Sequence, residues 1–134
     1  MMNGKHKYGY FFLRLPIAMS LLGHGLVRLP KLQGFSNWIV GLMQNSYLPK
    51  PMVLGFSYAV PFVEVFTGLF LLIGLFTRQT IYVALTLMAL FIFGNTTIEN
   101  WEPITSQLVH AGYLGMLLML IQHNDFSLDN KIKK

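Results

Sequence analysis

Long apolar runs, interrupted by a few polar positions, dominate the chain. Four of them approach the roughly 20 residues that a helix needs to cross a bilayer, and they cover about residues 10–29, 52–76, 80–98 and 104–122. Backbone amides in lipid have to bond within their own segment, so each run is predicted to be a helix. The pattern predicts an all-α membrane protein with one domain, residues 1–134, built as a bundle of four transmembrane helices.

The connection between the first two runs has a pattern of its own. Apolar side chains recur in it at helical i, i+3, i+4, i+7 and i+8 spacing: Phe35, Trp38, Ile39, Leu42 and Met43. This pattern predicts a short interfacial helix over residues 36–44, capped at its start by Ser36 or Asn37. Such a helix either covers the ends of the spans or gates a pocket. The last eleven residues, NDFSLDNKIKK, are predicted to be a solvated tail.

Composition agrees with a lipid environment. The chain of 134 residues is 54% hydrophobic and 11% charged, whereas soluble chains carry about 25% charged residues. The net charge is +5, but the basic residues lie at the edges of the apolar runs, which favours membrane lipid over nucleic acid as a partner. Without cysteine, disulfide chemistry, iron–sulfur clusters and thiolate zinc sites are excluded, and no metal site is predicted.

The distribution of Lys and Arg predicts the orientation. Most basic residues fall on the side of the two chain ends, and the cytoplasmic side of a membrane protein carries the excess of Lys and Arg. The chain is therefore predicted to cross a bacterial cytoplasmic (inner) membrane several times, with both termini in the cytoplasm. The basic residues of the outer side are Arg28, Lys31 and Lys50.

Four polar side chains lie within the apolar runs at a common depth. Counted at about 1.5 Å per residue from the cytoplasmic end of each span, they lie about 18–22 Å along it: His24, Glu64, Asn95 and His110. An ionisable group at this depth costs about 2.5–3.5 kcal/mol on insertion scales. Glu64 is therefore predicted to point into the bundle and to meet His24 or His110, directly or through one water. Whether it is structural glue or part of a ligand or proton site stays open.

Two arginines of the first run lie nearer its ends. Arg14 and Arg28 are predicted to reach opposite membrane surfaces with their long side chains. For Arg28 the alternative is that it closes the outer mouth of the pocket by pairing with an acidic residue. Arg28 and Asn95 therefore join His24, Glu64 and His110 as candidate ligand or proton-site residues.

Two segments resemble the DoxX-like membrane proteins. RLPIAMSLLGHGLVRLPKLQGF has an early Arg, then His-Gly, then a basic residue, and PFVEVFTGLFLLIGLFTR has an intramembrane Glu, a following Gly and a closing L-x-G-L-x-T-R. The resemblance extends over about residues 10–122 and implies a small four-helix membrane bundle. It implies these motif positions: Arg14, His24, Gly25, Glu64, Gly68, Gly74 and Arg78. The basic position after His-Gly is either Arg28 or Lys31.

Two classes of function follow. The resemblance implies an association with membrane redox systems, in which a His–Glu pair supplies hydrogen bonds and protons to a quinone or another small molecule. The chain would then be a redox protein or the membrane subunit of an oxidoreductase, and a protein partner would carry the electrons. The alternative is a non-enzymatic scaffold, assembly factor or accessory subunit. Haem b bound by His24 and His110 is disfavoured, since two histidines in four spans are a weak signal. Whether the protein is an enzyme stays open.

Overall fold

A computed structural model describes residues 8–132 of the chain, and the regular structure in this range is helical. Four long helices form the body of the molecule: α1 (Gly9–Arg28), α3 (Lys50–Ile73), α4 (Thr77–Thr97) and α5 (Glu102–Met119). Shorter pieces connect or follow them: η2 (Leu29–Lys31), α2 (Leu32–Leu42), η3 (Ile121–His123) and α6 (Leu128–Ile132). The all-α prediction is confirmed.

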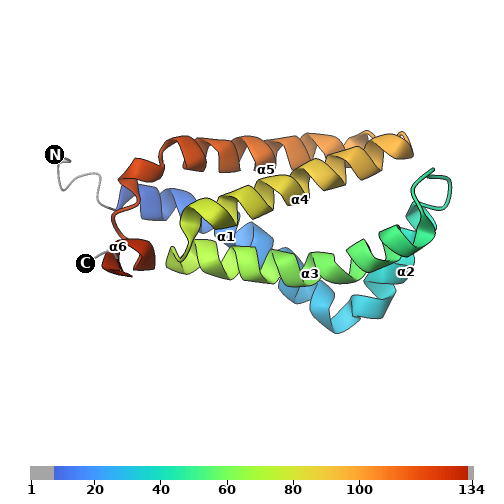
Figure 1. Cartoon of the computed structure of the whole chain (residues 1–134), viewed down its shortest axis with the longest axis horizontal. Helices are drawn as coiled ribbons and strands as arrows, with labels where there is room; N and C mark the ends of the chain where they lie inside the picture. The colour runs from blue at the N-terminus through green and yellow to red at the C-terminus, as the bar shows by residue number, and fades with distance from the viewer. Residues whose placement is uncertain (1–7, 133–134) are drawn as a thin grey trace.

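The long helices run side by side in an elongated bundle (Figure 1). The most extensive contacts join α1 to α3 and α4 to α5, and smaller ones join α3 to α4 and α1 to α5. The α2 helix folds back against α3 at one end of the bundle, while the α3–α4 turn and α6 lie at the opposite end. The core consists of buried aliphatic side chains from all four long helices.

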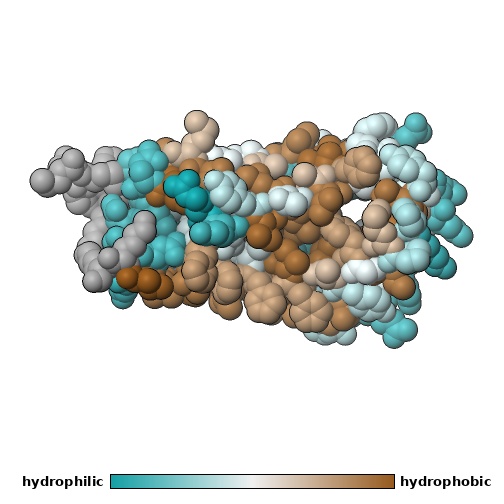
Figure 2. All heavy atoms as spheres, viewed as in Figure 1, coloured by the Kyte–Doolittle hydropathy of each residue, from teal (hydrophilic) through white to brown (hydrophobic). Residues whose placement is uncertain are grey.

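Three segments of the described chain are long and apolar enough to cross a membrane: Gly9–Leu42, Lys50–Ile73 and Thr77–Thr97. Figure 2 shows hydrophobic residues over the middle of the molecule and hydrophilic residues gathered at both ends. The protein is therefore an integral, multi-pass membrane protein. A helix, α5, forms where the sequence predicts the fourth span, but it carries Glu102, Gln107 and His110 and is not among these three segments. The fourth span stays a prediction.

A short helix follows the first span, but it begins earlier than predicted. It occupies Leu32–Leu42 rather than residues 36–44, after a 3₁₀ turn that contains Pro30. Ser36 does not cap it. The Ser36 hydroxyl is buried and lies 2.7 Å from the hydroxyl of Ser57 in α3, so it ties α2 to α3. The position of α2 at a membrane interface stays a prediction.

Two glycines set the distance between α1 and α3. A Cβ atom on Gly68 would collide with the backbone of Leu22, and a Cβ atom on Gly25 would lie 2.7 Å from the amide nitrogen of Val65 and 2.8 Å from the carbonyl oxygen of Pro61. Small residues at such contacts let helix backbones approach closely, which is a common basis of association in membranes. Both glycines are therefore required by packing.

Arg14 is buried at the end of the bundle where the C-terminal segment docks. Its side chain is 1% exposed and donates hydrogen bonds to the carbonyl oxygens of Leu71, at 2.9 Å, and Phe126, at 2.6 Å. The side chain is therefore buried rather than extended into solvent, and its reach to a membrane surface stays a prediction. The guanidinium has several donors in a fixed fork, and backbone carbonyls at the end of α3 and in the C-terminal segment accept from it.

Asp129 fastens the same segment to the turn between α3 and α4. Its carboxylate accepts hydrogen bonds from the amides of Phe76, at 2.6 Å, and Thr77, at 2.7 Å. Amides at the start of a helix have no partner within the helix, so this carboxylate acts as a cap. Gly74, at φ 72°, lets the chain turn after α3. The prediction of a solvated tail is wrong over the described residues, because this segment supplies and receives bonds that close the bundle.

The α1–α3 contact predicts opposite effects for two matched substitutions. Gly68→Ala should destabilise the bundle by about 1–3 kcal/mol, as overpacking does. Gly112→Ala on α5, where a Cβ atom meets nothing within 4 Å, should be neutral or stabilising, since alanine favours helix by about 1 kcal/mol over glycine. Thermal unfolding of both variants in detergent measures the difference. Equal unfolding temperatures would contradict the close approach.

The Asp129 cap predicts a local loss of stability. Asp129→Ala should cost about 1 kcal/mol, the usual effect of removing a cap, and should speed hydrogen exchange at the amides of Phe76 and Thr77. Asp125→Ala is the control, because the Asp125 carboxylate makes no hydrogen bond within residues 8–132. Unchanged exchange at both amides in Asp129→Ala would show that the segment does not dock as described.

Candidate functional site

Glu64 is held inside the bundle by an arginine of the neighbouring helix. The residue is 2% exposed, and its Oε1 atom accepts a hydrogen bond from Nη1 of Arg28 at 2.5 Å. Arg28 was predicted either to reach the membrane surface or to pair with an acidic residue, and in the structure it pairs with Glu64. The guanidinium carbon also lies 4.6 Å from the centre of the Phe35 ring, a cation–π contact. Three segments meet at this pair: the end of α1, the start of α2 and the middle of α3.

Two histidines stand beside this pair. The rings of His24, in α1, and His110, in α5, have centroids 6.3 Å apart. The Nδ1 atom of His24 lies 2.6 Å from the carbonyl oxygen of Ser20, and that of His110 lies 2.8 Å from the carbonyl oxygen of Ser106. Because a carbonyl oxygen only accepts, both Nδ1 atoms carry a hydrogen. In the neutral ring of His110, Nε2 accepts from the Ser20 hydroxyl at 2.8 Å.

These side chains line one cavity of about 210 Å³ between α1, α3, α4 and α5. We call it the polar cavity, and its polar side chains are His24, Arg28, Glu64, Ser106, Gln107 and His110. Within the described residues no direct hydrogen bond joins Glu64 to His24 or His110, and Oε1 of Glu64 accepts from Arg28 instead. The alternative contact through one water stays a prediction. The three residues nevertheless line the same cavity, as their common depth predicts.

Asn95, the remaining candidate, lies apart from the polar cavity. Its side-chain nitrogen donates to the carbonyl oxygen of Phe91, at 3.1 Å, and to Oε1 of Gln107, at 3.2 Å. It therefore joins α4 to α5 through a residue that does line the polar cavity. Phe35 is a contact residue of Arg28 that sequence reasoning did not find, because the 3₁₀ turn between α1 and α2 breaks the helical spacing between the two residues.

The carboxylate of Glu64 is engaged on one side only. Its second oxygen, Oε2, is buried and makes no hydrogen bond within residues 8–132. A buried polar atom without a partner costs about 1–3 kcal/mol, so the bond to Arg28 has to offset that loss. The polar cavity offers hydrogen-bond donors and acceptors. In the described part of the chain, no group of three His, Cys, Asp or Glu side chains is placed to hold a metal ion.

The other motif positions have roles outside the polar cavity. Gly25 and Gly68 lie at the α1–α3 contact, and Gly74 lies in the α3–α4 turn. Lys31 and Arg78 are both exposed. The basic position after His-Gly that contacts an acidic residue is therefore Arg28 and not Lys31.

The segment that contains His24, Arg28 and Glu64 matches one known family. Residues 7–103, which include α1, α2, α3 and α4, match the family described as methylamine utilisation protein MauE. The chain belongs to the MauE family. This match overturns the resemblance to the DoxX-like proteins, and the quinone-linked role that it implied is not carried forward. No curated protein and no solved structure matches the chain.

The shared motifs have a physical explanation that does not depend on family. Each combines a charged side chain with a glycine one turn away on the same helical face: Arg28 with Gly25, and Glu64 with Gly68. Any closely packed pair of membrane helices that buries an ion pair needs this combination. Such short motifs therefore reflect how two membrane helices pack, and they do not distinguish the MauE family from the DoxX-like proteins.

The ion pair predicts non-additive effects on stability. Arg28→Leu leaves the Glu64 carboxylate buried without its partner, and breaking a buried pair in this way costs about 3–5 kcal/mol. Glu64→Leu should cost less, because the Arg28 side chain is 28% exposed. The double variant Arg28→Leu, Glu64→Leu should regain part of the Arg28→Leu loss, since no charge is then stranded.

Unfolding of the wild type, the two single variants and the double variant in detergent measures this coupling. Lys31→Leu is the control, because Lys31 is an exposed basic residue one turn from Arg28. A cost for Arg28→Leu no larger than that for Lys31→Leu would refute the buried pair.

Proposed function

We propose that this MauE protein is a membrane accessory component of a methylamine-utilisation system and acts together with a protein partner. The family match supports the link to methylamine utilisation. The non-catalytic character is supported by how the ionisable groups of the bundle are used. Glu64 is paired with Arg28, and the Nδ1 atoms of both histidines are bonded within their own helices. The Arg28–Glu64 pair joins α1 to α3, and the contact between Ser20 and His110 joins α1 to α5, as structural glue does.

In this proposal α5 is the fourth span, with its polar groups turned toward the other helices. Two tyrosine hydroxyls support this placement: Tyr113 of α5 donates to the Leu13 carbonyl at 2.6 Å, and Tyr10 of α1 donates to the Leu117 carbonyl at 2.7 Å. These bonds join α5 to α1, and the exposed side chains of α5 are apolar apart from Glu102, Thr105 and Ser106 in its first turns. The exposed apolar side chains of α5 are Leu108, Val109, Met116 and Met119.

Four spans place both termini on one side of the membrane, and the excess of Lys and Arg on that side favours the cytoplasm. Because the chain has no cysteine, a thiol reagent labels only the introduced cysteine and so shows on which side of the membrane that position lies. Glu102→Cys at the start of α5 and Lys131→Cys in α6 are both exposed positions. They should react with a membrane-impermeant maleimide from opposite sides of oriented membrane vesicles. Labelling of both from one side would reject α5 as a span.

Deletion of the gene tests the function itself. The source organism without this chain should fail to grow with methylamine as its nitrogen source but should grow normally with ammonium. Cross-linking and purification from membranes of methylamine-grown cells should recover a stoichiometric protein partner. Normal growth of the deletion strain on methylamine would refute the proposed function.

Complementation separates structural glue from a proton or ligand site. Glu64→Gln keeps the size and the hydrogen-bonding ability of the side chain but removes its titratable proton, so it should restore growth on methylamine. Glu64→Leu removes the hydrogen bond as well and should not restore it. The membrane content of each variant, measured by immunoblot, is the control. A Glu64→Gln protein that accumulates normally but does not restore growth would show that the carboxylate acts as a proton or ligand site.

A further inference from the structure

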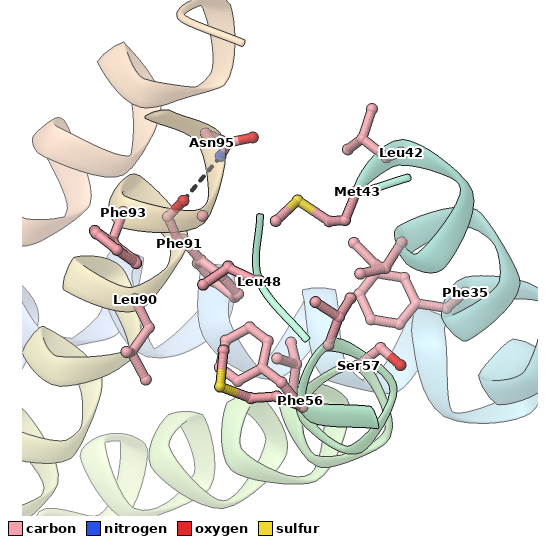
Figure 3. A pocket seen from close by; sticks show the side chains of 15 residues that line it. Phe35, Leu42, Met43, Leu48, Phe56, Ser57, Leu90, Phe91, Phe93 and Asn95 are labelled. Atoms are coloured by element: carbon pink, nitrogen blue, oxygen red, sulfur yellow. Dashed lines mark hydrogen bonds between the residues drawn. The ribbon is translucent and has the colours of Figure 1, made fainter. Parts of the chain in front are cut away.

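A second cavity, of about 290 Å³, lies between α2, α3 and α4 at the end of the bundle opposite α6. We call it the apolar cavity, because Ser57 and Asn95 are the two polar side chains in its wall. In Figure 3 aromatic and aliphatic side chains surround it, with Phe35 and Met43 on one side and Leu90 on the other. Its volume lies just below the range for small-molecule sites, about 300–1,000 Å³.

The two polar side chains of the wall are already engaged. The Ser57 hydroxyl donates to the Leu54 carbonyl at 2.6 Å and lies 2.7 Å from the Ser36 hydroxyl. The Asn95 amide donates to the Phe91 carbonyl, a bond drawn in Figure 3. Water in a buried site needs about two to four polar partners, and this wall offers none that is free within the described residues. The apolar cavity is therefore suited to an apolar occupant.

The apolar cavity opens toward lipid. Three of its wall residues, Met52, Leu90 and Phe93, are each about half exposed, at 52%, 47% and 50%. They belong to α3 and α4, two of the membrane-spanning candidates. Figure 2 shows a hollow between hydrophobic residues near this end of the molecule. A hydrocarbon chain can enter sideways from the bilayer, whereas a partner helix of about 10–12 Å diameter is too thick for the space.

A polar space adjoins this cavity. It has about 220 Å³ and shares the wall residues Met43, Leu48 and Val53 with the apolar cavity. Its own wall adds the polar side chains Gln44, Ser46 and Lys50. Lys50 is exposed and is the cation of this wall. An apolar cavity next to a polar space with a lysine matches an amphiphile that has a hydrocarbon chain and an anionic head group.

We propose that the two cavities together bind one anionic phospholipid, with an acyl chain in the apolar cavity and the phosphate beside Lys50. This inference is independent of the proposed function, because it rests on the shape and chemistry of the α2–α3–α4 end alone. The α2 helix forms one wall, so a bound lipid would also hold α2 against α3 and α4. The lipid would then be a structural partner of the fold.

Native mass spectrometry of the purified protein, titrated with phosphatidylglycerol or with phosphatidylcholine, tests the proposal. Wild type should bind one phosphatidylglycerol molecule about fivefold more tightly than phosphatidylcholine, the effect of roughly one lysine near a net anionic lipid. Both lipids carry a phosphate, but the choline cation of phosphatidylcholine offsets its charge. Lys50→Gln should remove this preference. Its control, Lys31→Gln, should keep it, because Lys31 lies outside both walls.

Gly94→Leu tests the acyl-chain half by filling the apolar cavity. A Cβ atom at Gly94 meets only the Met43 methyl group, at 3.6 Å, an ordinary contact, so the variant should fold. It should weaken the binding of both lipids about tenfold. The control Gly112→Leu, on an open face of α5, should leave the binding of both lipids unchanged. Equal binding of the two lipids to wild type, or lipid binding unchanged by both Lys50→Gln and Gly94→Leu, would overturn the proposal. Lys50→Gln keeps the test decisive if Gly94→Leu fails to fold.

Discussion

A charged side chain inside an apolar bundle has to find its partners within the bundle, and the Arg28–Glu64 pair is how this chain meets that constraint. Lipid offers Glu64 no hydrogen-bond donor, so α1 has to bring Arg28 to the height of the carboxylate. That requirement fixes how α1 lies along α3. The close contact at Gly25 involves the backbone of Val65, the residue after Glu64. The ion pair and the close helix packing are therefore parts of one interface.

The buried arginine at the other end satisfies the same constraint without a direct ion pair. Arg14 donates to two backbone carbonyls, one at the end of α3 and one in the C-terminal segment. Backbone carbonyls are good acceptors for a guanidinium, because its donors form a rigid fork. The chain that follows α5 is thereby drawn onto the bundle, where Asp129 can cap α4. A short polar segment thus closes the α3–α4 end of the bundle.

The sequence predicts the positions of the long helices well, because hydrophobic length is what the bilayer selects. The partner of Glu64 was harder to predict. Counting residues along a span gives the depth of each Cα atom in the membrane, but it does not give how far the side chain extends from that atom. In a helix the Cα–Cβ bond tilts toward the N-terminus, so Arg28 extends back toward the level of His24. The docked C-terminal segment could not be predicted for a related reason. Its polar residues bond to distant backbone groups, which leave no periodic pattern in the sequence.

The two cavities lie on opposite sides of α4 and differ in the helices that face them there. Phe91 of α4 lines both, and one turn further along α4 the Asn95 amide bonds to Gln107 on the polar side. Polar groups of α1 and α5 face one side of α4, while α2 and α3 present almost only hydrocarbon to the other. The polar cavity is therefore lined by hydrogen-bonding groups that include the Arg28–Glu64 pair, and the apolar cavity is left for hydrophobic contacts. A protein partner then has the exposed ends and the lipid-facing surfaces available for recognition, which is consistent with an accessory role in the membrane.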